Sequence, residues 1–170
     1  MRDYIIMTDS CCDLSQQEVE ELELTVLPLS FTIEGKTLLN TPDHADMSPE
    51  EFFAKIAAGA DCTTAAVNVG QFTDAMEKVL QEGKDILCVC FSSALSTTYQ
   101  SACIAAEDLR EKYPEAKILV IDSLSASRGQ GMLLYRAVRE RREKNLTIDE
   151  LDATSALSSR ASATGSSSTI

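Results

Sequence analysis

The chain has 170 residues, and 27 acidic against 15 basic side chains give it a formal net charge of −12. A surface this acidic repels phosphate backbones and anionic headgroups, which argues against nucleic-acid and membrane-surface binding. No apolar run approaches the ~20 residues of a membrane span, and the first residues lack the apolar stretch of a secretory signal. We therefore expect one cytoplasmic domain with its own core and no membrane insertion.

Short apolar runs alternate with amphipathic segments along the chain. The predicted strands are Tyr4–Met7, Thr25–Thr32 around Pro28, Ile86–Phe91 and Lys117–Ile121. The predicted helices are Pro49 to about Ala58, Gln71–Gln81, Tyr99–Lys112, Gly131–Lys144 and a further one opening at Thr147. Runs without polar alternation are typical of parallel strands buried on both faces. The order predicts an α/β fold with a mainly parallel sheet flanked by helices.

The composition changes near residue 150. Residues 151–170 consist mostly of Ser, Ala and Thr, with almost no large apolar side chain after Leu157. Such a segment buries too little surface to offset the entropy lost on ordering. We therefore expect a folded domain over residues 1–150 and a disordered or non-native tail over residues 151–170, as in a truncated or frame-shifted product.

Cysteine and histidine usage gives little sign of metal or nucleophilic chemistry. The six cysteines of an acidic chain without a signal sequence are expected to be reduced. Cys88 and Cys90 lie on one face of a predicted strand, which favours core thiols over a zinc site. His44 is the only histidine and has no evident partner. We expect no metal and no cofactor.

Hydroxyl clusters follow the predicted strands. Three of them are Thr8-Asp9-Ser10, residues 92–98 and Asp122–Ser125, and a fourth, Thr63-Thr64, precedes the helix at Gln71. Any one of these hydroxyls is explained as a helix cap. Convergence of all four at the carboxyl ends of parallel strands would instead form a ligand-binding rim. Because these loops contain no Lys or Arg, hydroxyls and helix N–H groups would have to hold an anion such as a carboxylate.

Other chemistries have weaker support. The chain has no Gly-x-x-x-x-Gly-Lys phosphate loop and no Gly-x-Ser-x-Gly elbow, and Gly129 and Gly131 lack the third glycine of a dinucleotide motif. A small hydrolase or phosphotransferase using Asp9 with Ser10, or Asp122 with Ser123, remains an alternative without a general base. A fragment with capped helices and no ligand is the third possibility.

Several motifs together have a familiar order and spacing. They are Thr8-Asp9-Ser10 with Asp13-Leu14, Pro28-Leu29, Thr63-Thr64 before Phe72, Ser92-Ser93-Ala94-Leu95-Ser96-Thr97-Thr98-Tyr99-Gln100-Ser101-Ala102, and Val120-Ile121-Asp122-Ser123. With these residues the chain resembles the DegV family of bacterial fatty-acid-binding proteins from its N-terminus to about Glu150. The serine-rich block is the most specific element.

The resemblance implies an α/β first domain, a second domain of similar size and a long-chain fatty acid held between them. It implies that Thr64 and Ser96 hydrogen-bond the acyl carboxylate, with Ser93 and Ser92 next. Thr8 and Ser10 complete the expected ligand-binding set. Some family members present the bound acid to a fatty acid kinase, so the resemblance implies a carrier and not an enzyme.

The chain departs from the family pattern in three places. Ala65 replaces a common Ser, and Thr97 replaces a common Gly, which would be strained if that position required a positive φ. The residue 151–170 tail stands where the second domain would begin. Because each buried methylene contributes about 0.8 kcal/mol, losing one wall of an acyl tunnel would weaken binding strongly. We expect this form to bind fatty acid weakly or not at all.

Overall fold

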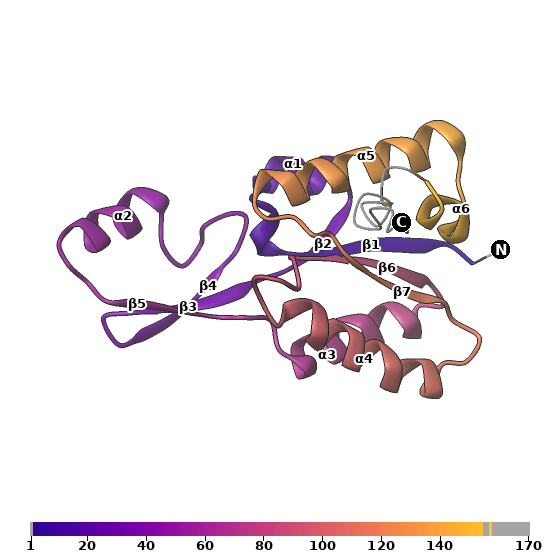
Figure 1. Ribbon diagram of the computed structural model, residues 1–170, viewed down its shortest axis with the longest axis horizontal. Coiled ribbons are helices and arrows are strands. Elements are labelled where there is room, and N and C mark those ends of the chain that lie inside the picture. The colour runs from indigo at the N-terminus through magenta and orange to yellow at the C-terminus, as the bar shows by residue number, and fades with distance from the viewer. Residues whose placement is uncertain (1, 155–156, 158–170) are drawn as a thin grey trace, which may run out of the picture.

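The computed structural model describes residues 2–154 and 157, which form two β-sheets with helices around them (Figure 1). The first sheet has four parallel strands in the order β2-β1-β6-β7. Their bounds are β1 (Tyr4–Asp9), β2 (Leu24–Leu27), β6 (Asp85–Cys90) and β7 (Ile118–Asp122). The predicted α/β fold with a parallel sheet is confirmed.

Helices cover both faces of the parallel sheet (Figure 1). One face carries α3 (Val69–Gln81) and α4 (Thr98–Lys112), and the other carries α1 (Gln16–Glu21), α5 (Arg128–Lys144) and α6 (Ile148–Asp152). The fully buried strand β6 supplies both cores in alternation. Leu87 and Val89 face the α5 side, whereas Ile86, Cys88 and Cys90 face α3 and α4. Burial on both faces explains why this strand has no polar residues between its apolar ones.

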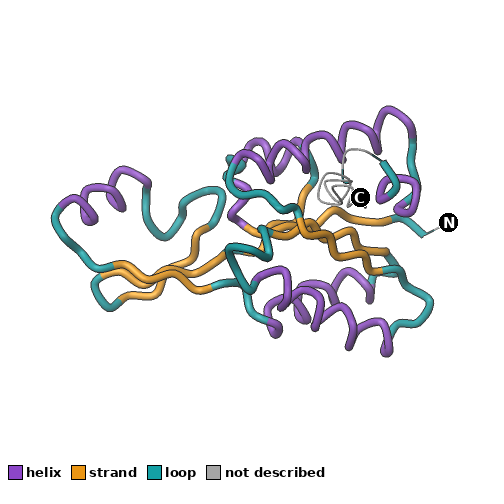
Figure 2. Tube along the Cα trace, in the orientation of Figure 1, coloured by secondary structure: helices purple, strands orange, loops and turns teal. Residues whose placement is uncertain are grey.

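Residues 29–65 form a separate arm that projects beyond the parallel sheet (Figure 2). Its antiparallel sheet has the order β4-β3-β5, and α2 lies against it through a 5.5 Å edge-to-face contact between the Phe31 and Phe52 rings. The arm contains β3 (Leu29–Ile33), β4 (Lys36–Asn40), α2 (Pro49–Ala57) and β5 (Cys62–Ala65).

The predicted single strand over Thr25–Thr32 is wrong. Strand β2 ends at Leu27 in the parallel sheet, and β3 begins at Leu29 in the arm. Pro28 lies between them; it has no N–H to donate to a sheet, so it fits at a strand boundary. The chain therefore changes sheets at this proline.

Most predicted helices are present with shifted starts. Helix α3 begins at Val69 behind the N-cap Asn68, and α5 begins at Arg128, three residues before its predicted start. The prediction omitted helix α1, β4 and β5. A capping box between Ser15 and Glu18 marks α1, with the Ser15 side chain accepting from the Glu18 N–H and Glu18 accepting from the Ser15 N–H.

The predicted tail overlaps the described residues only in part. Residues 155–156 and 158–170 lie outside them, so the disorder expected there stays a prediction. Leu151 and Leu157 are both buried in the core beneath α5. Over the described part of the chain, no helix is long and apolar enough to cross a membrane.

Candidate functional site

Three strand ends meet at one edge of the parallel sheet. Strands β1, β6 and β7 run parallel in register, so their carboxyl ends, Asp9, Cys90 and Asp122, lie along this edge. The serine loop, residues 91–97, connects β6 to α4, and the β7–α5 loop comprises residues 123–127. This carboxyl edge is the place where ligands bind in open parallel sheets.

Asp9 anchors the beginning of the serine loop. Its carboxylate is fully buried and accepts hydrogen bonds from the Phe91 N–H at 2.7 Å and the Cys11 N–H at 3.1 Å. Burial raises the pKa of Asp9, although the two backbone donors favour the charged form and oppose the rise. Both carboxylate oxygens of Asp9 therefore accept from the backbone, one on each of two loops.

Asp122 joins the serine loop to the β7–α5 loop. One carboxylate oxygen, Oδ1, accepts from the Ser93 N–H at 3.1 Å and from the Leu124 N–H at 3.0 Å. The Ser92 N–H donates to the Ser125 carbonyl at 3.1 Å. These bonds fix the two loops to each other at the carboxyl edge.

Ser96 lies at the entrance to α4 with its hydroxyl partly engaged. Its Oγ accepts from the Thr98 N–H at 3.2 Å and lies 2.9 Å from the buried Thr98 hydroxyl. When Thr98 donates to Ser96, the Ser96 proton remains free for an anionic ligand. Thr97 has φ −80°, so the branched side chain at this position is not strained.

Ser92 and Ser93 differ in exposure but both retain a donor. Ser93 is exposed, and among the described residues its hydroxyl has no hydrogen-bond partner. Ser92 is buried, and its Oγ accepts from the Ala94 N–H at 3.3 Å, which leaves the hydroxyl proton available. The seven-residue serine loop therefore carries three serine side chains, Ser92, Ser93 and Ser96.

Thr8 and Ser10 have structural hydrogen bonds at this edge. Thr8 lies inside β1, is fully buried, donates to the Val89 carbonyl at 2.7 Å and accepts from Gln130 Nε2 at 3.0 Å. Ser10 Oγ accepts from the Leu29 N–H at 3.0 Å and so connects β1 to the arm. The sequence analysis predicted Thr8 just after the end of the first strand, but β1 continues two residues beyond the predicted Tyr4–Met7 and so includes Thr8.

Thr64 is not in a loop at the carboxyl edge, which corrects the predicted convergence of four hydroxyl clusters. It is exposed in β5 and pairs across the arm sheet with Phe31, so it shares the face that α2 contacts. The neighbouring Thr63 pairs with Thr32 and points to the opposite face. Strand β5 was not predicted, because its four residues are mostly exposed and form no alternating apolar pattern.

The pairs considered for an enzyme are held in the scaffold. Ser123 is fully buried and donates to the Ser125 carbonyl at 3.1 Å, while Asp122 accepts from backbone N–H groups. Among the described residues, no three His, Cys, Asp or Glu side chains form a group that could hold a metal ion. Cys88 and Cys90 are buried with their sulfurs 3.5 Å apart, which confirms them as core thiols.

A polar hollow of about 290 Å³ opens between the segment that joins β1 to α1, the end of β4 and the start of α5. Its lining includes Ser10, Asn40, His44 and Arg128 but none of the serine-loop residues. Ser10 therefore faces different neighbours from Ser92, Ser93 and Ser96.

Comparison with known proteins assigns the fold to a family. The sequence matches the family described as "Uncharacterised protein, DegV family COG1307" over residues 4–164. This chain belongs to the DegV family. A DegV domain-containing protein of Clostridium perfringens is 37% identical over 151 residues, which are 89% of this chain and 51% of that protein. The chain thus spans about half the length of the curated relatives it matches.

Solved structures share this fold over about half of their own length. A stearic acid-binding protein from Eubacterium ventriosum has a TM-score of 0.77 and 28% identity, covering 87% of this chain and 50% of that one. A DegV family protein from Thermus thermophilus, described by its fatty acid binding, has a TM-score of 0.75 and 30% identity, covering 89% and 51%. The described domain therefore has the architecture of one half of these proteins.

Proposed function

We propose that this DegV chain binds a long-chain fatty acid and that its serine loop holds the carboxylate. The observation that carries the proposal is the set of free hydroxyl donors on the serine loop at the carboxyl edge. Two solved relatives with this fold are described as fatty-acid-binding, one of them with stearic acid. Hydroxyl and backbone donors can satisfy a carboxylate without a buried lysine or arginine.

Ser96 and Ser93 are the main proposed ligand residues, with Ser92 behind them and Thr64 reaching the headgroup from the arm. Ser96 and Ser92 already accept backbone N–H groups, so their remaining protons are directed by the scaffold. Asp9 and Ser10 connect the serine loop and the base of the arm to the same end of β1, which favours a shared site. Thr8 is the least favoured member of the expected set because both its donor and its acceptor are in use.

We further propose that this chain alone binds the acid weakly. It spans about half the length of its relatives, and each methylene left without a protein wall forgoes about 0.8 kcal/mol. Isothermal titration with palmitate is therefore expected to give a dissociation constant weaker than micromolar. A micromolar or tighter value would contradict this part of the proposal.

Substitution of the hydroxyls tests the headgroup assignment. In equilibrium dialysis with labelled palmitate, we expect the double variant S93A/S96A to weaken binding at least about tenfold, because a hydrogen bond to a charged group contributes about 1.5–3 kcal/mol. Thr64→Ala should have a smaller effect in the same direction. The matched control is Thr63→Ala, an exposed neighbour on the opposite face of β5, which should leave binding unchanged.

The proposal also requires that the wild-type chain itself bind palmitate saturably. Equilibrium dialysis carried to palmitate concentrations above the dissociation constant should saturate at one palmitate per chain. Absence of saturable binding would defeat the proposal, and equal affinity of wild type and S93A/S96A would defeat the residue assignment.

The carrier role is a second level of the proposal. Asp9, Asp122 and Ser123 accept from or donate to the backbone, so they are poorly placed for hydrolysis or phosphotransfer. We therefore propose a carrier that presents the carboxylate to a separate fatty acid kinase. A purified fatty acid kinase supplied with ATP should phosphorylate palmitate faster when the chain is present. Turnover of generic ester or phosphate substrates by the chain alone would instead favour the enzyme alternative.

A further inference from the structure

Carboxylates from the two strands beside β6 hold the serine loop. Asp9 of β1 accepts from the N–H of residue 91, and Asp122 of β7 accepts from the N–H of residue 93. The loop proposed to bind an anion is thus fixed by two acidic side chains.

Asp122 has the more direct influence on a ligand residue. Its Oδ1 lies 3.1 Å from the Ser93 nitrogen, so the hydrogen bond fixes the backbone from which the Ser93 hydroxyl projects. The same oxygen accepts from the Leu124 N–H at 3.0 Å, which ties the serine loop to the neighbouring loop. Asp122 is partly exposed, whereas Asp9 is fully buried, so Asp122 can be substituted with less disturbance of the core.

We propose that Asp122 is a positioning residue for the ligand carboxylate: its hydrogen bonds hold Ser93 in the binding arrangement, while its negative charge lowers the affinity for an anion. This inference rests on the proposed function. The two effects have opposite signs, because hydrogen bonds to a carboxylate strengthen the loop and like charges repel across a short distance. Variants that separate acceptor from charge will therefore separate the effects.

Asp122→Asn and Asp122→Ala make this separation. Asparagine keeps a carbonyl oxygen that can accept from Ser93 and Leu124 but carries no charge, whereas alanine removes both properties. With ligand delivered from cyclodextrin, we expect D122A to bind palmitate at least about fivefold more weakly, because the Ser93 and Leu124 N–H groups lose the acceptor that joins the two loops. We expect D122N to bind palmitate about two- to threefold more tightly than wild type at low salt.

A neutral ligand isolates the charge effect. Hexadecanol has the same chain and no negative charge, so D122N should bind it as wild type does, while D122A should still bind it more weakly. The gain of D122N for palmitate should also shrink at high salt, because screening reduces repulsion. A residue needed only for folding would change both ligands alike and would show no salt-dependent gain.

Amide hydrogen exchange measures the positional part without ligand. Exchange at Ser93 and Leu124 should accelerate in D122A and stay near the wild-type rate in D122N. The control is Asp108→Asn, an exposed acid on α4, which should change neither exchange at these amides nor palmitate affinity.

Each outcome decides the inference. Wild-type exchange rates in D122A would overturn it, and so would equal losses of palmitate binding in D122N and D122A. A wild-type chain that binds no palmitate would end the proposed function, but accelerated exchange in D122A alone would still support the positioning of Ser93 by Asp122.

Discussion

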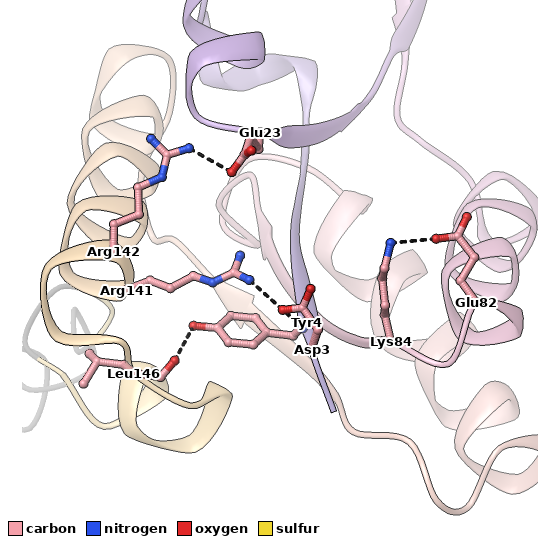
Figure 3. Close-up of polar contacts among 8 residues, drawn as sticks. All are labelled: Asp3, Tyr4, Glu23, Glu82, Lys84, Arg141, Arg142 and Leu146. Carbon is pink, nitrogen blue, oxygen red and sulfur yellow. Dashed lines mark hydrogen bonds and ion pairs between the residues drawn. The ribbon is translucent and has the colours of Figure 1, made fainter. Parts of the chain in front are cut away.

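The two edges of the parallel sheet are built from different chemistry. At the amino edge, the Tyr4 hydroxyl donates to the Leu146 carbonyl at 3.1 Å, and the Arg141 guanidinium lies 4.0 Å from the Tyr4 ring centroid (Figure 3). Arg141 also pairs with Asp3 at 3.0 Å, and Arg142 pairs with Glu23. At the carboxyl edge, the serine loop contains no arginine or lysine, and its contacts are between hydroxyls, carboxylates and backbone N–H groups.

The two edges differ in how available their polar groups are to a ligand. Arg141 and Arg142 at the amino edge already have partners of opposite sign, which connect α5 to the residues just before β1 and β2. At the carboxyl edge, the carboxylates of Asp9 and Asp122 accept from backbone N–H groups, and the hydroxyl protons of Ser92 and Ser93 remain free. A hydroxyl with a free proton can bind an anion without first breaking an ion pair, which makes the carboxyl edge the better candidate site.

The largest expected effect on this comparison comes from the packing of α5 beneath the carboxyl edge. A Cβ on Gly131 would lie 2.8 Å from the Cys12 carbonyl oxygen and 3.0 Å from Leu14 Cδ2. Because the carbonyl belongs to the backbone, Gly131→Ala should push α5 away from the end of β1. We expect a loss of about 1–3 kcal/mol in the free energy of unfolding, measured by urea denaturation.

Gly129→Ala is the matched control two residues away on the same helix. A Cβ there would lie 3.5 Å from Ser125 Cβ, which is an ordinary contact. Its unfolding free energy should stay within about 0.5 kcal/mol of wild type. Equal stability of the Gly131→Ala and Gly129→Ala variants would show that the edge is not closely packed against α5.

The second prediction concerns the buried carboxylate of the carboxyl edge. Burial raises the pKa of Asp9 above its unfolded value, so the folded chain takes up this proton at a higher pH than the unfolded chain. The contribution of Asp9 to stability is therefore full below the unfolded pKa and is lost as pH rises through the folded pKa. The slope for one proton is at most about 1.4 kcal/mol per pH unit.

Comparison with Asp9→Asn isolates this titration from those of exposed carboxylates. As pH falls from 7.5 toward 4, the unfolding free energy of wild type should improve relative to that of D9N. Chemical denaturation at a series of pH values measures the difference. A difference that is constant with pH, or that changes in the opposite direction, would mean that the Phe91 and Cys11 N–H groups dominate over burial.

The core and the serine loop were predictable, because their signals are local. A continuous apolar run is typical of a buried parallel strand, and Ile86–Phe91 matches β6 (Asp85–Cys90) to within one residue at each end. The serine-rich block after that strand was correctly placed on the loop leading into α4. Local composition and strand order were enough for this part of the candidate site.

The arm was not predictable in the same way, because its pattern depends on contacts between distant residues. The short strands β4 and β5 form only by pairing with β3, and Thr64 takes its orientation from its pairing with Phe31. The sequence did contain a signal for one hairpin, which is Gly35. It lies in the turn between β3 and β4, where Glu34 and Gly35 both have a positive φ that favours glycine. The roles of Thr8 and Asp9 also depend on partners about 80 or more residues away, Val89, Gln130 and Phe91.

The smallest expected effect tests the amino edge. Tyr4→Phe removes the hydroxyl that donates to Leu146 but keeps the ring beside Arg141, so the unfolding free energy should fall by about 0.5–1.5 kcal/mol. Lys84→Gln removes the exposed ion pair with Glu82, which is also drawn in Figure 3, and should cause no measurable change in a urea titration. Neither variant should alter palmitate binding, because both lie at the edge away from the serine loop. Loss of palmitate binding in Tyr4→Phe would show that the two edges are coupled through β1, and the contrast drawn between them would no longer hold.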